Sequence, residues 1–406
     1  MITRRDSLKV FGTALVTVWM GSAARVALAD APTDRRFIVV ILRGALDGLA
    51  AVPPLGDRDY ASVRGSLAFA SAGTSDGALD LDGFFALNPA LQPLSDMYKA
   101  RELAVFHAVA SPYRARSHFD GQDLLENGTP TPHGAADGWL NRALGLIGAD
   151  GARLGLAVGQ SVPLMLRGKT PVGAYAPQRM PELAEDFLQR LQALYASDKV
   201  FAPALAEGMA AQSRNDEVLG DGKDDAMGAG KLRGPNALQG VVANVGKLMA
   251  ADDGPRIAVM DAGGWDTHAN QGLLTGRLAT VLKGLGESLA TLKTSLGPAW
   301  NKTAVAVVTE FGRTAAVNGT GGTDHGTAGI AFLLGGAVNG GRVIARWPGL
   351  SAGNLFEGRD LAPTLDLRSV LKGVLAEHLN LAPSAIERAV FPDSASAPPL
   401  RDLIRA

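Results

Sequence analysis

The stretch RFIVVILRG, residues 36–44, is apolar at every position from Phe37 to Leu42. A strand with one solvated face alternates apolar and polar residues, whereas a strand covered on both faces is apolar throughout. The stretch therefore predicts a strand in a sheet that is covered on both sides. Five further runs share the pattern: LAVFHAVA (103–110), LGLAVG (154–159), RIAVMDA (256–262), TAVAVVTE (303–310) and GIAFLLGG (329–336).

Amphipathic stretches separate these apolar runs. In LATVLKGLGESLATLKTSL, residues 278–296, leucine and alanine recur every three or four residues, which is typical of a helix with one buried face. The predicted helices cover residues 89–100, 118–127, 137–147, 181–197, 236–251, 275–296 and 366–379. Strands and helices in alternation predict an α/β fold, with a doubly wound, mostly parallel sheet and helices on both faces.

The composition is that of a globular protein with a large core. The chain has 406 residues, 47% of them hydrophobic, and no cysteine, which excludes disulfides and any cysteine ligand or nucleophile. We expect a single domain over residues 30–406. The segment 213–234 is charged, glycine-rich and almost free of large apolar side chains, so it predicts a flexible insertion within this domain.

The first 29 residues resemble a twin-arginine export signal. Arg4 and Arg5 precede a short apolar run, and Ala27-Leu28-Ala29 supplies a small-x-small cleavage pattern. A basic N-terminal helix or a membrane anchor is the alternative, but Arg25 interrupts the run. Export implies the twin-arginine machinery as a partner and a periplasmic or extracytoplasmic location.

Removal of the signal shifts the formal net charge from −1 to about −4. Nothing in this balance indicates a nucleic-acid partner. No later apolar segment approaches the roughly 20 residues of a membrane span, so we expect none in the mature form.

Polar residues follow the predicted strands, where loops of an open parallel sheet converge on a ligand. Arg43 and Asp47 follow the first run, and RARSHFDGQD (114–123) follows the second. Asp266 and His268 follow the fourth, and Glu310 and Arg313 end the fifth. Asp324 and His325 instead precede their run, so that strand must run antiparallel or be reached by a returning loop.

Carboxylates and imidazoles gathered at one edge would repel and desolvate one another unless a cation compensated them. Mixed ligands of this kind suit zinc, manganese or iron, and with more oxygen donors magnesium or calcium. The pattern therefore predicts a site for divalent metal ions, with Asp266 and His268 as its best ligand candidates.

Five motifs together resemble the domain of unknown function 1501 family, whose members are exported bacterial proteins similar to the alkaline phosphatase and sulfatase superfamily. They are RGALDGL (43–49), RSHFDGQDLLENG (116–128), GGWDTHANQ (263–271), VVTEFGRT (307–314) and GTDHGTAG (322–329). The resemblance spans about residues 36–380.

The resemblance implies an alkaline-phosphatase-like fold with a two-metal site. By this likeness Asp47 is the early metal aspartate and Ser117 the nucleophile. The other metal residues that it implies are Asp266, His268, Glu310, Asp324 and His325. His118, at the start of a predicted helix, is a further candidate for a metal or substrate contact. TEFG lacks the superfamily's histidine, and the lack of cysteine excludes a formylglycine.

A metal-dependent hydrolase of phosphate or sulfate esters is the favoured function, with a small-molecule ester as substrate. Two cations would hold the ester group and stabilise the leaving oxygen, and Ser117 would attack from a helix start whose amides face the oxyanion. Arg43, Arg116 or Arg313 would clamp the remaining oxygens.

Structural interpretations stand beside these roles. Ser117 and Asp120 match a capping box, Asp47-Gly48 matches a turn, and Glu310 fits an ion pair with Arg313. His118 also fits a polar surface residue, and His107 within an apolar run indicates a hydrogen-bonded core residue. A non-catalytic metal- or ligand-binding relative and a structural component of a periplasmic complex remain alternative functions.

Overall fold

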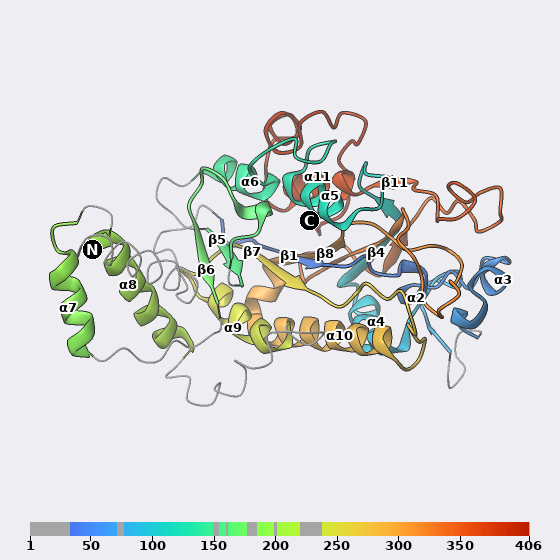
Figure 1. Cartoon of the computed structure of the whole chain (residues 1–406), viewed down its shortest axis with the longest axis horizontal. Helices are drawn as coiled ribbons and strands as arrows, with labels where there is room; N and C mark the ends of the chain where they lie inside the picture. The colour runs from blue at the N-terminus through green and yellow to red at the C-terminus, as the bar shows by residue number, and fades with distance from the viewer. Residues whose placement is uncertain are drawn as a thin grey trace, which may run out of the picture.

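The computed structural model describes residues 33–70, 77–148, 154–159, 161–176, 185–198, 201–219 and 238–405. Nine strands form one sheet in the order β10-β4-β9-β8-β1-β7-β5-β6, with β11 paired to β4 (Figure 1). The strands of this sheet are β1 (Arg36–Leu42), β4 (Leu103–Ala110), β5 (Gly155–Val158), β6 (Val172–Tyr175), β7 (Ile257–Ala262), β8 (Thr303–Thr309), β9 (Gly329–Leu334), β10 (Arg342–Ile344) and β11 (Leu365–Asp366). A separate hairpin pairs β2 (Leu79–Asp80) with β3 (Ala86–Leu87).

Helices cover both faces of the sheet (Figure 1). The longer helices are α4 (Gln92–Lys99), α5 (His118–Asn127), α6 (Trp139–Ile147), α7 (Glu185–Tyr195), α8 (Phe201–Leu219), α9 (Gln239–Ala250), α10 (Arg277–Leu296) and α11 (Leu367–Glu377). Short turns of helix are α2 (Gly48–Ala51), α3 (Tyr60–Arg64), α12 (Pro383–Ala385), η1 (Gly65–Leu67), η2 (Pro89–Leu91), η3 (Leu164–Leu166), η6 (Gly297–Lys302) and η7 (Ile386–Val390). The α/β fold with helices on both sides of a mostly parallel sheet is confirmed.

Alternate residues of β1 enter two different cores. Ile38, Val40 and Leu42 pack in the cluster that contains α4, α9 and α10. Phe37, Val39 and Ile41 pack in the cluster that contains α6 and α11. Since successive side chains of a strand point to opposite faces, this two-sided cover requires an apolar residue at every position.

Strand β9 runs antiparallel to both of its neighbours, β4 and β8. The other described pairings of the sheet are parallel. The residues before β9 therefore lie at the edge where β1, β4, β7 and β8 end. This confirms one of the two arrangements expected for Asp324 and His325.

The structure adds elements that the apolar pattern did not predict. Strands β6, β10 and β11 are short, and helix α8 covers residues 213–219 of the segment expected to be a flexible insertion. The rest of that segment, and the expected signal at residues 1–29, lie outside the described residues. Among the helices that are described, none combines the length and apolar character needed to cross a membrane.

Two histidines are built into the core as neutral side chains. His107 is fully buried, its Nε2 lies 3.0 Å from the Val52 carbonyl, and its Nδ1 accepts from the Ala108 N–H at 2.8 Å. His378 is also buried, with Nε2 2.8 Å from the Arg36 carbonyl. Burial lowers the pKa of each from the ordinary 6.5 to about 4. The expectation that His107 is a hydrogen-bonded core residue is confirmed.

Acid is expected to destabilise the protein through these two groups. In the unfolded chain both histidines become protonated below about pH 6.5, whereas in the folded chain they stay neutral down to about pH 4. The free energy of unfolding therefore falls as the pH drops from 6.5 to about 4. At about pH 5 each histidine should lower the free energy of unfolding by about 2 kcal/mol. Urea denaturation at about pH 7.5 and about pH 5 measures the difference.

Two variants assign that difference to the core. His107→Leu should remove about 2 kcal/mol of the pH-dependent change, whatever it does to the overall stability. Leu194→Ala, at an exposed position without a titrating side chain, should leave the change as it is. An unaltered pH dependence in His107→Leu would contradict the role given to this buried ring.

Candidate metal centre

Loops from four strands meet at the edge of the sheet described above. His118 begins α5 after β4, Asp266 and His268 follow β7, and Glu310 follows β8. His325 arrives on the loop before β9. Gly44 after β1, with φ 120°, lets the Asp266 loop approach, since a Cβ there would lie 2.7 Å from the Asp266 nitrogen. Several of the residues predicted for the site therefore come from loops at one edge of the sheet.

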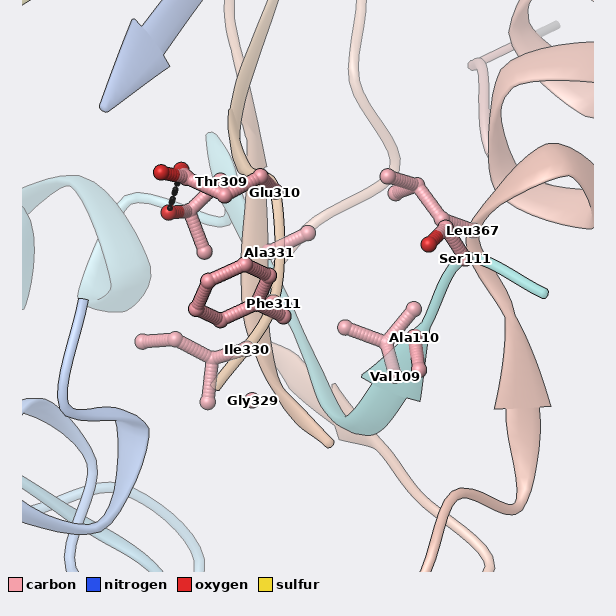
Figure 2. A pocket seen from close by; sticks show the side chains of 10 residues that line it. All are labelled: Val109, Ala110, Ser111, Thr309, Glu310, Phe311, Gly329, Ile330, Ala331 and Leu367. Carbon is pink, nitrogen blue, oxygen red and sulfur yellow. Dashed lines mark hydrogen bonds between the residues drawn. The ribbon is translucent and has the colours of Figure 1, made fainter. Parts of the chain in front are cut away.

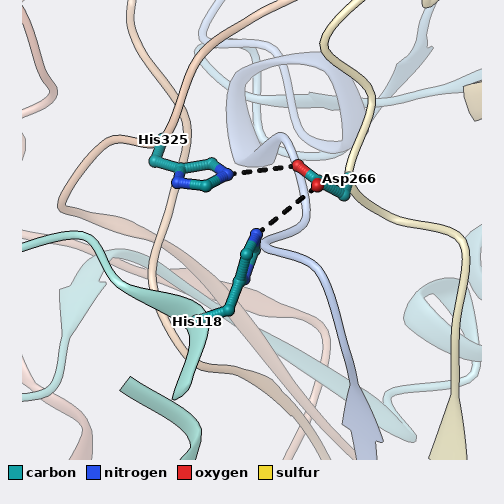
Figure 3. Close-up of side chains that lie close together, drawn as sticks. All are labelled: His118, Asp266 and His325. Carbon is teal, nitrogen blue, oxygen red and sulfur yellow. Dashed lines mark hydrogen bonds and ion pairs between the residues drawn. The ribbon is translucent and has the colours of Figure 1, made fainter. Parts of the chain in front are cut away.

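His118, Asp266 and His325 form the core of this site (Figure 3). One ligand atom from each lies within 4.8 Å of the other two. Asp266 Oδ2 is 3.5 Å from His118 Nε2, and Asp266 Oδ1 is 3.3 Å from His325 Nε2. The carboxylate thus lies between two imidazoles that come from different loops, which is a geometry able to hold a cation.

Glu310 orients the His118 ring through its Nδ1, the ring nitrogen that does not face Asp266. Its Oε1 lies 2.7 Å from His118 Nδ1, and the ring stacks on Phe311 at a centroid distance of 5.0 Å. This hydrogen bond raises the pKa of His118. Burial alone would raise the pKa of Glu310, but hydrogen bonds, with that of His118 foremost, hold it below its usual range. Glu310 is therefore an ionised acceptor for His118.

Arg313 fixes Asp266. Its Nη1 lies 2.6 Å from Asp266 Oδ1, and its guanidinium also contacts the hydroxyl and carbonyl of Thr323. Burial opposes ionisation of Asp266, but the hydrogen bond and charge of Arg313 outweigh it and lower the pKa. A fully buried guanidinium thus keeps this carboxylate charged and oriented.

His268 and His325 complete the group. His268 Nε2 lies 2.9 Å from Asp266 Oδ1, and its Nδ1 lies 3.1 Å from Asp324 Oδ1. His325 Nδ1 lies 3.0 Å from the Arg116 carbonyl. Burial, followed by the charge of nearby His118, lowers the pKa of His325. The neutral form that metal binding requires is favoured at His325.

The divalent cation implied by the motifs fits these residues. His118 Nε2 is buried and has no hydrogen-bond partner, although a carboxylate oxygen lies 3.5 Å away. A buried polar atom without a partner is costly. An imidazole nitrogen facing a carboxylate across such a gap is stabilised by a cation that both can bind.

Ser117 lies at the start of α5 without acting as a side-chain cap. Its N–H instead donates to the Tyr113 hydroxyl at 3.1 Å, and that hydroxyl donates to Asp120 at 3.2 Å. The capping box expected as an alternative is therefore replaced by a relay through Tyr113. Arg116, just before Ser117, has a φ of 63°, an uncommon conformation for a residue with a Cβ.

A small pocket lies beside the same loops (Figure 2). Thr309, Glu310 and Phe311 line one part of it, and Val109 and Ser111 line another. Thr309 donates to Glu310 Oε2 at 2.9 Å. The pocket adjoins the carboxylate that holds His118, and His118, Asp266 and His325 are not among its lining residues.

A family model described as "Protein of unknown function (DUF1501)" matches residues 106–390, more than half of the chain. The chain belongs to the DUF1501 family. The likeness that the motifs suggested is thereby confirmed, and the matched span of this DUF1501 protein contains every residue of the candidate centre. A search of curated proteins found no match.

Among solved structures, the DUF1501 protein is similar to Ps i-CgsB in complex with k-i-k-neocarrahexaose, with 9% identity, a TM-score of 0.42, and coverage of 87% of this chain and 74% of that chain. It is similar to a protein in the alkaline phosphatase superfamily from Vibrio parahaemolyticus, with 12% identity, a TM-score of 0.32, and coverage of 79% and 67%. It is also similar to phosphonate monoester hydrolase of Agrobacterium radiobacter, with 13% identity, a TM-score of 0.33, and coverage of 86% and 74%. All three TM-scores lie below 0.5.

The arginines expected to clamp substrate oxygens are already paired within the DUF1501 protein. Arg43 contacts Glu126 at 2.8 Å and Asp261 at 3.0 Å. Arg116 contacts Glu357 and Asp360, and Arg313 contacts Asp266 as described. Each guanidinium thus faces a carboxylate of the protein, an arrangement that no local sequence pattern predicts.

Asp47 is not among the residues whose ligand atoms meet at the centre, and its contacts indicate a structural role. Its side chain is fully buried, caps α2 through the Ala50 N–H, and pairs with Arg64 at 2.7 Å. Gln271 donates to the same oxygen at 2.7 Å. Arg64 and Gln271 are not predictable as partners of Asp47, because a buried partner 17 or 224 residues away leaves no local pattern.

Asp47→Asn tests whether Asp47 has a structural role or is a metal ligand. The substitution leaves Arg64 buried and unpaired, so the free energy of unfolding should fall by about 3–5 kcal/mol in urea denaturation. Zinc bound per folded molecule, measured by elemental analysis, should stay at the wild-type level. Loss of zinc with unchanged stability would restore Asp47 as a ligand.

Proposed function

We propose that this protein is an exported, metal-dependent hydrolase of phosphate or sulfate esters, with its cation held by His118, Asp266 and His325. The observation that carries the proposal is the buried His118 Nε2, which faces Asp266 across 3.5 Å and has no hydrogen-bond partner. When bound, a divalent cation supplies Lewis-acid stabilisation of an ester oxygen and lowers the pKa of a coordinated hydroxyl or water.

Ser117 is the proposed nucleophile. It lies between His118, whose ring enters the centre, and Arg116, whose carbonyl contacts His325. Its hydroxyl is not used for capping, so it is available to attack an ester at this edge. The α5 helix begins here, and the N–H groups of its first turn lack intrahelical acceptors and can donate to anionic ester oxygens.

The paired arginines assign the binding of ester oxygens to other groups. Arg313 orients Asp266, and Arg43 is shared between Glu126 and Asp261. The cation and the first-turn amides of α5 therefore remain as the principal partners of the ester group. This replaces the bidentate arginine clamp expected from the sequence.

A non-catalytic metal-binding relative is the second candidate. The same arginine pairs favour it, because a hydrolase for anionic esters commonly presents a free guanidinium to its substrate. Such a relative would bind metal at the same residues and turn over no ester.

Turnover of nitrophenyl phosphate and nitrophenyl sulfate separates the two candidates. The zinc- or manganese-loaded wild type should hydrolyse at least one of them. Ser117→Ala should lower kcat by about 10³-fold or more while keeping its metal, since His118, Asp266 and His325 are unchanged in it. Ser62→Ala, an exposed serine elsewhere, is the matched control. Metal binding without wild-type turnover of either ester would favour the non-catalytic relative.

Export rests on the sequence of residues 1–29, and the twin-arginine machinery is the proposed partner. Replacing both Arg4 and Arg5 by lysine should leave uncleaved precursor in the cytoplasm, detected by immunoblotting of cell fractions, because this pathway requires the arginine pair. Unchanged delivery to the periplasm would contradict the assignment.

A further inference from the structure

The three imidazoles of the centre share one pattern of contacts. Each Nδ1 faces an oxygen acceptor: Glu310 at 2.7 Å for His118, Asp324 at 3.1 Å for His268, and the Arg116 carbonyl at 3.0 Å for His325. A neutral imidazole whose Nδ1 donates to such an acceptor carries a lone pair on Nε2. All three rings thus turn Nδ1 toward an oxygen acceptor outside the centre and Nε2 toward the centre.

The three Nε2 atoms face Asp266. Those of His268 and His325 lie 2.9 and 3.3 Å from its Oδ1, and that of His118 lies 3.5 Å from its Oδ2. The Nε2 atoms of His268 and His325 are 2.9 Å apart. With both protons on Nδ1, two lone pairs would oppose each other at this distance. A cation bound by both nitrogens would remove this repulsion, because each lone pair would then be donated to the metal.

We infer that the centre takes one nitrogen-preferring transition-metal ion of the zinc class, on the Nε2 atoms of His118, His268 and His325 and the carboxylate of Asp266. Glu310 and Asp324 are positioning residues that hold two of these rings. The inference rests on the metal site of the proposed function and specifies its ligands. Three imidazoles and one carboxylate suit zinc, cobalt or manganese better than magnesium or calcium, which prefer all-oxygen sites.

This assignment differs from the two-metal site implied by the family resemblance. Two of the expected carboxylate ligands, Glu310 and Asp324, are engaged by imidazole Nδ1 atoms, and a third, Asp47, is engaged by Arg64. Within the described residues, no second group of three or more potential ligands meets the same spacing. The described residues thus offer one such group, and we expect it to take one ion.

Glu310 is the stronger of the two positioning residues. It is 1% exposed, and its carboxylate also accepts from the Gly44 N–H at 2.9 Å, from Gln122 at 3.1 Å and from Thr309 at 2.9 Å. The Asp324 side chain is 51% exposed and has Asn318 as a further partner at 3.0 Å. Because the buried Glu310 carboxylate is held by more hydrogen bonds than the Asp324 carboxylate, it should contribute more to metal affinity.

The test uses full-length mature protein stripped with a chelator and titrated with zinc, cobalt, magnesium and calcium in a calorimeter. Zinc and cobalt should bind at one ion per chain, and cobalt should give a visible absorption band characteristic of nitrogen ligands. Magnesium and calcium should bind more weakly by orders of magnitude. Two zinc ions per chain, or magnesium binding equal to that of zinc, would overturn the inference.

Variants test the positioning residues. Glu310→Gln should weaken zinc binding by about 10- to 100-fold and shift the cobalt spectrum, with Asp324→Asn showing a smaller loss. Glu102→Gln, which breaks an ion pair with Lys293 and contacts no imidazole, is the matched control and should bind zinc as the wild type does. The melting temperature of each metal-free variant identifies any loss of folding, and Asp324→Asn, at an exposed position, decides the question if Glu310→Gln does not fold.

Wild-type zinc affinity in both Glu310→Gln and Asp324→Asn would overturn the positioning roles. None of these measurements depends on ester turnover, so they test the metal site independently of the proposed hydrolase activity. One tightly bound zinc ion without hydrolysis would support the site and contradict the proposed reaction.

Discussion

The placement of β9 is the constraint on which the centre depends. This strand lies between β4 and β8 and runs antiparallel to both, so its first residues meet the last residues of its neighbours. His325, which precedes β9, thereby meets His118 after β4 and Asp266 after β7. A parallel β9 would place His325 at the opposite edge of the sheet, and the group could not form.

Charge compensation organises the edge once the loops are there. Two of the carboxylates face histidine rings, and the others face guanidinium groups of Arg43, Arg64, Arg116 or Arg313. The Arg64–Asp47 pair is buried on both sides, and such a pair is costly to form and costly to break, so it fixes its partners in one arrangement. Asp266 differs from the other carboxylates because it has both kinds of partner, with Arg313 on one side and imidazole nitrogens on the other. That position makes it the natural anchor of a cation.

The fold was predictable because its pattern is local. The runs at 36–44, 103–110 and 303–310 are mostly apolar over the strands that they form, and the loops after them carry the polar residues of the edge. Helix α8 was not predicted, since its alanine-rich and charged sequence lacks a clear apolar face. Asp266, His268 and His325 were found as candidate ligands because each lies next to such a strand.

The roles within the site were less predictable, because they depend on contacts between distant residues. Nothing near Asp47 shows that Arg64 and Gln271 close around it, and nothing near Glu310 shows that its partner is His118, 192 residues away. A carboxylate that binds a metal and one that holds a metal-binding histidine have the same sequence. Only the three-dimensional arrangement of Nδ1 and Nε2 atoms separates them.

Anomalous X-ray diffraction at the zinc edge, from crystals of the zinc-loaded protein, would locate the cation itself. We expect a single strong peak about 2.0–2.1 Å from the Nε2 atoms of His118, His268 and His325, and adjacent to Asp266. A peak at Asp47, or no ordered zinc between these rings, would contradict the proposed centre.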